Sequence, residues 1–209
     1  MLKPIRLLYD KNINPSSIDA VKDGVSEILD IAGVKVDISE DHSIDELVSM
    51  GMRTSRDGKQ INGHPIHADL AIDSEHHNRY NILVLDQDLN NYSSIPSIQK
   101  DYDFILGFGD PGFGVILSTF KFQTLDEQTR YECIKTEAIH ETGHMFGLPD
   151  KNRGSNLQEK GGIHCTNICV MRQGFSVPKD WINMTKDRFD YGNALCDQCS
   201  EELIYNLNK

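Results

Sequence analysis

The chain has 209 residues, of which 38% are hydrophobic and 25% charged, as in an ordinary globular protein with one main core. Its formal net charge of −11, with no run of Lys and Arg, argues against nucleic acid or an anionic membrane as the main partner. No stretch approaches the ~20 apolar residues of a membrane span, and the N-terminus lacks the apolar run of a signal peptide. We therefore expect a cytoplasmic monomer.

Hydrophobic periodicity predicts alternating strands and helices in the first half of the chain. The sequence GDPG at 109–112 is a strong turn signal, which places a tight connection between the last two strands. Residues 52–79 are rich in Gly, Asp, His and Arg, so they are expected to be mostly loop, with surface histidines. Strands are expected at 5–10, 34–39, 81–89, 102–110 and 112–120, and helices at 16–33 and 43–51.

A long helix is predicted over residues 125–147, ended by Gly147. After it the chain becomes irregular and rich in Gly, Pro and Cys, until a final helix at 200–207. The pattern predicts an α/β (α+β) fold with a mixed sheet. Residues 1–147 are expected to form an N-terminal lobe that includes the long helix, residues 148–209 an irregular C-terminal lobe, and the two to meet at a cleft.

The stretch HETGHMFG, residues 140–147, carries the clearest chemical signal. Residues four apart on a helix face the same way, so His140 and His144 can bind one metal ion. Glu141 lies about 100° round the helix, where its carboxylate can reach a water held by the metal. Zinc lowers the pKa of such a water to roughly 7, and the glutamate can pass its proton to a leaving amine. The glycine three residues after the second histidine is typical of metzincin zinc peptidases.

Four of the five cysteines are clustered late in the chain, at positions 165, 169, 196 and 199. Two close pairs separated by a connector have the spacing of a closed four-cysteine zinc site. Two disulfides are the alternative, but they conflict with the missing export signal. Cys165, Cys169, Cys196 and Cys199 are therefore predicted to bind a structural zinc.

Taken in order, HETGHMFG, HC (164–165), CVM (169–171) and CDQC (196–199) resemble the archaemetzincins. The resemblance covers roughly the last 75 residues. It implies a metzincin-like zincin fold with one catalytic zinc and a second zinc bound by the cysteines. It also implies that Met171 is the Met-turn, an apolar floor beneath the catalytic metal. The chain departs from the family because 16 residues, 148 to 163, separate Gly147 from His164. We interpret them as a surface insertion.

The third ligand of the catalytic zinc has two candidates. Asp150 lies ten residues after His140, where metzincins place this ligand, and the pattern HETGH–GLPD also resembles the snapalysins, which use aspartate there. His164 is favoured by its neighbour, because Cys165 bound to the structural zinc would hold it at the catalytic zinc. A neutral imidazole also leaves more of the metal's charge to acidify water. Both candidates stay open.

These features predict a zinc metallopeptidase of metzincin type that cleaves peptide or protein substrates. Glu141 is the expected general base, and the expected cofactors are one catalytic and one structural Zn²⁺. The alternative is a non-catalytic zinc protein, or a peptide-binding module whose peptidase-like site is closed by the insertion. An intact Glu141 favours the enzyme, because a structural zinc site has no use for a base.

Overall fold

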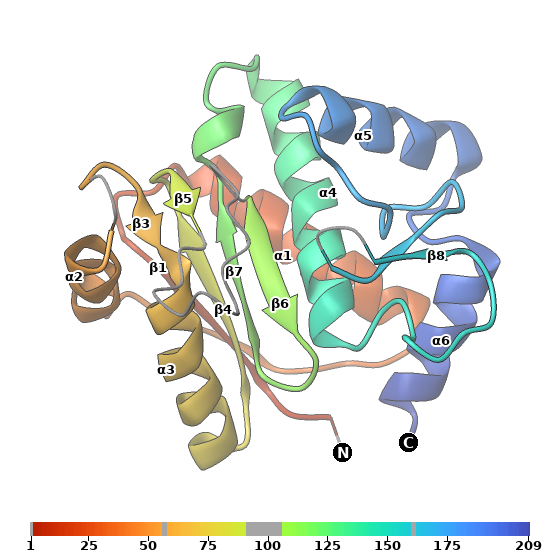
Figure 1. Cartoon of the computed structure of the whole chain (residues 1–209), viewed down its shortest axis with the longest axis horizontal. Helices are drawn as coiled ribbons and strands as arrows, with labels where there is room; N and C mark the ends of the chain where they lie inside the picture. The colour runs from red at the N-terminus through yellow and green to blue at the C-terminus, as the bar shows by residue number, and fades with distance from the viewer. Residues whose placement is uncertain (1, 56–57, 91–105, 160–161) are drawn as a thin grey trace.

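A five-stranded mixed sheet forms the centre of the computed structural model, which describes residues 2–55, 58–90, 106–159 and 162–209 (Figure 1). The sheet order is β2-β1-β4-β7-β6. The first four strands run parallel, and β6 joins β7 antiparallel at one edge. The strands are β1 (Ile5–Tyr9), β2 (Ile38–Asp41), β4 (Tyr80–Leu85), β6 (Gly107–Asp110) and β7 (Gly114–Ser118).

Helices cover both faces of the sheet, giving three layers (Figure 1). Successive side chains of a strand point to opposite faces, so one strand contributes to two cores. In β4, Ile82 and Val84 pack with α1 and α4, whereas Leu83 and Leu85 pack with α2 and α3. These helices are α1 (Pro15–Ile31), α2 (Asp45–Arg53), α3 (Gly63–His77) and α4 (Glu127–Met145).

The remaining elements lie mostly in the C-terminal part, beside α4 and away from the sheet (Figure 1). Two helices there are joined to the rest by irregular chain, and short strands pair in twos. No helix in the described ranges combines the length and apolar character that a membrane crossing requires. The elements are β3 (Ile61–Asn62) with β5 (Leu89–Asn90), β8 (Leu157–Gln158) with β9 (His164–Cys165), the 3-10 helix Phe120–Phe122, α5 (Lys179–Tyr191) and α6 (Asp197–Leu207).

The helix α4 begins and ends at residues suited to those positions. The Asp126 side chain accepts a hydrogen bond from the Thr129 amide at 3.1 Å, which satisfies one of the free amides of the first turn. Past the C-terminal end, Gly147 has a φ of +81°, a conformation that favours glycine. The chain therefore turns sharply just after the HETGH sequence.

Two glycines of β6 let α4 lie directly against the sheet edge. A Cβ on Gly109 would stand 2.7 Å from the carbonyl oxygen of Glu141, and one on Gly107 would stand 2.9 Å from Glu141 Cγ. Neither contact is sterically possible, so only glycine permits this approach. The edge strand and the HETGH helix consequently form the two walls of one cleft.

The predicted mixed α/β fold is confirmed, and so are the hairpin at GDPG and the long helix, but one large segment was assigned wrongly. Residues 52–79 are not mostly loop, because α3 occupies 63–77. Asn62 caps its start by accepting from the His64 amide at 3.2 Å, and Asn78 ends it with a φ of 47°. The predicted strand 34–39 begins only at Ile38.

Other differences concern element lengths and the C-terminal part. The predicted strand 81–89 is two strands, β4 and β5, and the strand predicted at 102–110 is described only from residue 106, since 102–105 lie outside the described residues. The stretch before the final helix is not wholly irregular, because α5 spans 13 residues there. The proposed division into lobes at residue 147 stays a prediction.

Candidate active site

Three histidines converge where α4 meets β9. His140 and His144 stand one turn apart on α4, His164 comes from β9, and one ring nitrogen of each lies within 4.8 Å of the others. Burial lowers the pKa of all three imidazoles, that of His140 well below its usual value and that of His144 to about 3. The rings are therefore neutral at physiological pH, the form that binds metal ions.

The hydrogen bonds of two of these rings leave their Nε2 atoms as acceptors. His140 Nδ1 donates to the Val170 carbonyl and His144 Nδ1 to the Leu148 carbonyl, both at 2.7 Å. The two Nε2 lone pairs then face each other at 3.1 Å. Two acceptors this close repel each other unless a proton or a metal cation lies between them. Zn–N bonds of about 2.0–2.1 Å in a tetrahedral site would separate two ligand nitrogens by about 3.3 Å. The donor set fits zinc.

His164 and Cys165 are adjacent in β9 but serve different groups. Neighbouring side chains of a strand point to opposite faces. His164 faces the other two histidines, with ring centroids 5.3 Å from His140 and 5.0 Å from His144. Its Nδ1 is buried and has no hydrogen-bond partner among the described residues. Cys165 points to the cysteines, so the two-residue strand connects both candidate metal sites.

Asp150 does not join the three histidines. One oxygen of its carboxylate accepts from the backbone amide and the side-chain amide of Asn152, at 2.8 and 3.1 Å. Its own backbone amide donates to Glu202 on α6 at 2.9 Å. Asp150 lines the cleft, but its side chain is engaged in the turn that follows α4.

The carboxyl of Glu141 belongs to a buried acidic pair. Burial, followed by the nearby Glu137 carboxyl, raises the pKa of Glu141 well above its usual value. Burial also raises the pKa of Glu137 to about 8, although the Trp181 indole donates a hydrogen bond to it. Glu141 Oε2 is buried without a hydrogen-bond partner in the described parts of the chain. Glu141 lines the same cleft as the three histidines and has an oxygen left to accept a proton.

Met171 packs against α4 inside the HETGH sequence. It is fully buried, and a Cβ added to Gly143 would stand 2.3 Å from its sulfur. The Met171 carbonyl accepts a hydrogen bond from the Cys165 amide at 2.9 Å, which connects it to β9. The structure thus brings Met171 beside the helix that carries two of the three histidines.

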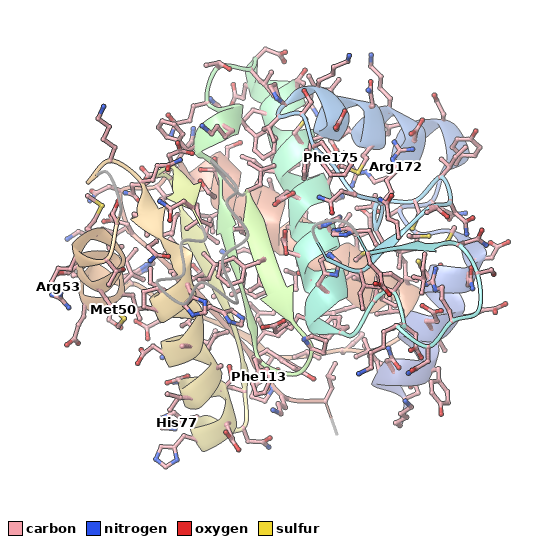
Figure 2. All side chains as sticks on the ribbon, in the orientation of Figure 1. Met50, Arg53, His77, Phe113, Arg172 and Phe175 are labelled. Atoms are coloured by element: carbon pink, nitrogen blue, oxygen red, sulfur yellow. The ribbon has the colours of Figure 1, made fainter. Side chains whose placement is uncertain are left out.

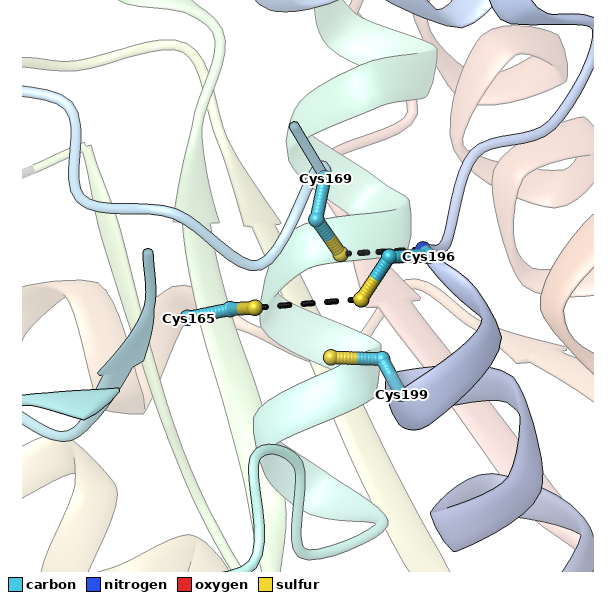
Figure 3. A group of neighbouring side chains, drawn as sticks. All are labelled: Cys165, Cys169, Cys196 and Cys199. Atoms are coloured by element: carbon cyan, nitrogen blue, oxygen red, sulfur yellow. Dashed lines mark hydrogen bonds between the residues drawn. The ribbon is translucent and has the colours of Figure 1, made fainter. Parts of the chain in front are cut away.

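The four late cysteines form a second convergent group. All are free, and their sulfur atoms lie within 4.8 Å of one another and face a common centre (Figure 3). The Sγ atoms of Cys165 and Cys196 are 3.8 Å apart. Zn–S bonds of about 2.3 Å in a tetrahedral site place the sulfurs about 3.8 Å apart, so this group also fits zinc. Hydrogen bonds, first from the Cys169 thiol, lower the pKa of Cys165 to about 2 and of Cys196 to about 6.

A cleft of about 1100 Å³ contains the histidine group. Its walls come from β6, α4, the start of α3, the loop 173–177 with Trp181, and both ends of the insertion, including 148–152 and 162–163. Residues 160 and 161 of the insertion lie outside the described residues. The prediction that the insertion is merely a surface segment is wrong in part, because Arg153 within it has a side chain only 3% exposed.

The histidines of α3 do not all lie at the surface as expected. His77, near the far end of the helix, points outward (Figure 2). His67 is buried, packs on Phe108 with ring centroids 4.7 Å apart, and lines the cleft. Its Nδ1 lies 3.7 Å from the Asp110 carboxylate. His67 therefore contributes its imidazole to the wall of the cleft opposite α4.

Comparisons with known proteins bear on the sequence and the fold of the chain. No protein-family model matches the chain. It is 31% identical over 107 residues to archaemetzincin from Nanoarchaeum equitans (strain Kin4-M), over 51% of this chain and 46% of that protein. It is 30% identical over 107 residues to archaemetzincin from Archaeoglobus fulgidus, which covers 51% of this chain and 53% of that protein. The matches thus span about half the length of each relative.

Solved structures share the whole fold. The crystal structure of archaemetzincin from Methanopyrus kandleri matches with a TM-score of 0.66 and 19% identity, over 100% of this chain and 97% of that one. The chain resembles the archaemetzincins. Archaemetzincin from Archaeoglobus fulgidus, crystallised with malonate, matches with a TM-score of 0.61 and 21% identity, over 95% of this chain and 99% of that one. At these identities the structures establish the fold, and with the sequence relatives they confirm the resemblance inferred from the motifs.

Two residues of this candidate site were not found from the sequence. Trp181 packs beside His140, with ring centroids 6.4 Å apart, and donates to Glu137, which lies on α4 itself. A lone tryptophan and a glutamate one turn before the motif carry no distinctive spacing. The glycines of GFG in β6 did carry a signal, since glycine inside a strand often marks a close backbone approach. That signal identifies the wall against α4.

Proposed function

We propose that this chain is a zinc-dependent peptidase in which His140, His144 and His164 hold the catalytic zinc and Glu141 is the general base. The observation that carries the proposal is the pair of Nε2 acceptors facing each other at 3.1 Å, in the same cleft as a buried glutamate with an unpartnered oxygen. A site that only had to bind metal structurally would not need that carboxyl or an open cleft.

The chemistry divides between the metal and the residues around it. When bound, zinc supplies a Lewis acid that polarises the scissile carbonyl and lowers the pKa of the attacking water. Glu141 takes the proton of that water and passes it to the leaving amine. Its Oε2 is buried without a hydrogen-bond partner in the described parts of the chain, so this oxygen is free to take the proton and hold it until the amine departs. Val170 and Leu148 carbonyls keep two of the imidazoles in orientation.

The substrate that fits the cleft is an extended peptide. Within the described residues, β6 is paired on one side only, by β7, and it lines the cleft opposite α4. A free strand edge binds an extended chain through backbone hydrogen bonds, whatever the side chains. An extended peptide bound along β6 would pass the histidine group, which lines the same cleft. We propose peptides or proteins as substrates on this basis.

The second zinc of the proposal is held by the four cysteines. It would tie the loop 165–169 to the start of α6 and so fix His164, the residue before Cys165. Metal counting should find about two zinc ions per chain. Loss of one zinc in Cys199→Ser together with loss of folded structure would agree with a structural role.

Digestion of a mixed peptide library with the zinc-loaded chain tests the function. We expect cleavage that stops when a chelator removes zinc and returns when zinc is added. No cleavage by a chain with both sites filled would instead support a non-catalytic zinc protein or a peptide-binding module.

A further inference from the structure

The insertion reaches the cysteine group through one buried arginine. Arg153 Nη1 donates to Cys165 Sγ at 3.4 Å and Nη2 to Cys199 Sγ at 3.2 Å. The same guanidinium binds the carboxylate of Glu202 through Nε, at 2.7 Å, and through Nη2. Its side chain is only 3% exposed. A buried arginine whose three side-chain nitrogens all have partners is unusual in a segment that otherwise looks like a surface loop.

Charge explains why an arginine is needed here. Four thiolates around Zn²⁺ carry a net charge of about −2, and Glu202 adds a further negative charge one turn after Cys199 on α6. Arg153 lies between the carboxylate and two of the sulfurs, so it offsets the repulsion between them. Its N–H groups also donate hydrogen bonds to the sulfurs, which spreads their charge.

The same contacts fix the rim of the cleft. Residues 148–152 line the cleft and directly precede Arg153. The Asp150 amide donates to Glu202 at 2.9 Å, and the Arg153 amide closes a turn on the Asp150 carbonyl at 3.0 Å. Leu148 in this segment supplies the carbonyl that orients His144. A chain of direct contacts therefore runs from the cysteine sulfurs through Arg153 to the histidine site.

We propose that Arg153 is a positioning residue that fastens segment 148–153 to the four-cysteine site, so that this site holds both its metal and the rim of the catalytic cleft in place. The inference rests on the zinc content proposed above but not on peptidase activity. Removing the guanidinium should have two effects: the cysteines bind their metal less tightly, and the backbone hydrogen bonds of 148–153 open more often.

The test uses the full-length chain loaded with Co²⁺, because the thiolate-to-cobalt absorption reports on the cysteine site and not on the histidines. We expect Arg153→Met to lose this absorption to a chelator about 10–100-fold faster than the unaltered chain. Arg153→Lys should fall between them, since an ammonium keeps the charge but cannot reach two sulfurs and a carboxylate together. Arg153→Met combined with Glu202→Gln removes the unpaired carboxylate, so any acceleration that remains measures the lost bonds to sulfur.

A matched control is Arg188→Met. Arg188 is also buried, at 6% side-chain exposure, and is paired with two carboxylates, but it does not contact Cys165 or Cys199. It should leave cobalt loss unchanged even if it lowers stability.

Hydrogen exchange of the zinc-loaded variants gives a second readout: the amides of 148–153 should exchange faster in Arg153→Met and not in Arg188→Met. Equal rates of cobalt loss and exchange in Arg153→Met and the unaltered chain would overturn the proposal. Absence of thiolate-to-cobalt absorption in the unaltered chain would overturn it too. Loss of peptidase activity alone would bear on the proposed function and not on this one.

Discussion

Gly143 and Met171 pack so closely that there is no room for a side chain on Gly143 while Met171 keeps its position. A Cβ on Gly143 would stand 2.3 Å from Met171 Sδ and 3.0 Å from its Cε, and Met171 has no exposed surface. Because Gly143 lies between the two histidines of α4, this contact sets how the helix rests on the segment that follows β9. The close packing of α4 on Met171 therefore requires glycine at position 143.

We therefore expect Gly143→Ala to lower the free energy of unfolding by about 1–3 kcal/mol through overpacking. Met171→Ala alone should cost about 2–5 kcal/mol through the cavity it leaves. The double substitution should cost less than the sum of the two, since alanine at 171 makes room for the new methyl group. Urea unfolding of the zinc-loaded variants measures this. Gly154→Ala is the control, because a Cβ there meets nothing within 4 Å. Strict additivity would show that the contact is not tight.

The third metal ligand is tested by comparing two alanine variants. His164 lies with the other two histidines, whereas the Asp150 carboxylate accepts hydrogen bonds within its own turn. We predict that His164→Ala retains about one zinc per chain, the one bound by the cysteines, and that Asp150→Ala retains about two. Metal counting by mass spectrometry reads out both. Loss of one zinc from Asp150→Ala, with His164→Ala unaffected, would reverse the assignment.

Asp73, which connects α3 to the sheet, should account for part of the loss of folding stability in acid. It accepts from Arg79 at 2.8 and 2.9 Å and from Asn81 at 2.8 Å, and it pairs with Arg6 at 2.9 Å. Burial alone would raise the pKa of Asp73, but these donors and charges outweigh burial and lower it to about 2. The carboxylate therefore stabilises the fold above its unfolded pKa of about 4, and this contribution is lost as the pH falls toward the folded value.

Asp73→Asn should accordingly lower the free energy of unfolding by about 1 kcal/mol near neutral pH, a modest amount because solvent screens the pair. The difference from the unaltered chain should shrink as the pH falls from about 4 to about 2. Any loss of zinc in acid affects both chains and cancels in the difference. Urea titrations across this range measure it, with Asp69→Asn, an exposed aspartate of the same helix, as the control. Parallel curves for the two chains would contradict the assignment.

The sequence predicted those parts of the molecule whose signals are local. The helix α4, the GDPG hairpin and the HETGH sequence each depend on residues close in the chain, and they were located correctly. The helix α3 was missed because, among its buried residues, Ile66 and Leu70 are its only large apolar ones, so the apolar periodicity is too weak. Its cap, Asn62, was a usable signal.

Other features could not be read locally. In α5, the buried residues Trp181, Met184, Thr185 and Arg188 have helical spacing, but two of the four are polar and conceal the pattern. Arg153 lies in a polar, glycine-containing segment, and it is buried only because Glu202, 49 positions later, folds against it. Such contacts depend on the tertiary arrangement, which spacing alone does not reveal.

The most direct test of the account is the cleavage of a susceptible peptide by the unaltered chain and by Glu141→Gln, each with its zinc content measured. Glutamine keeps the size of the side chain but cannot take a proton. We predict equal zinc content and a rate about 10²–10⁴-fold lower in the variant. Equal rates of cleavage at equal zinc content would contradict the assignment of Glu141 as the base, and with it the proposed mechanism.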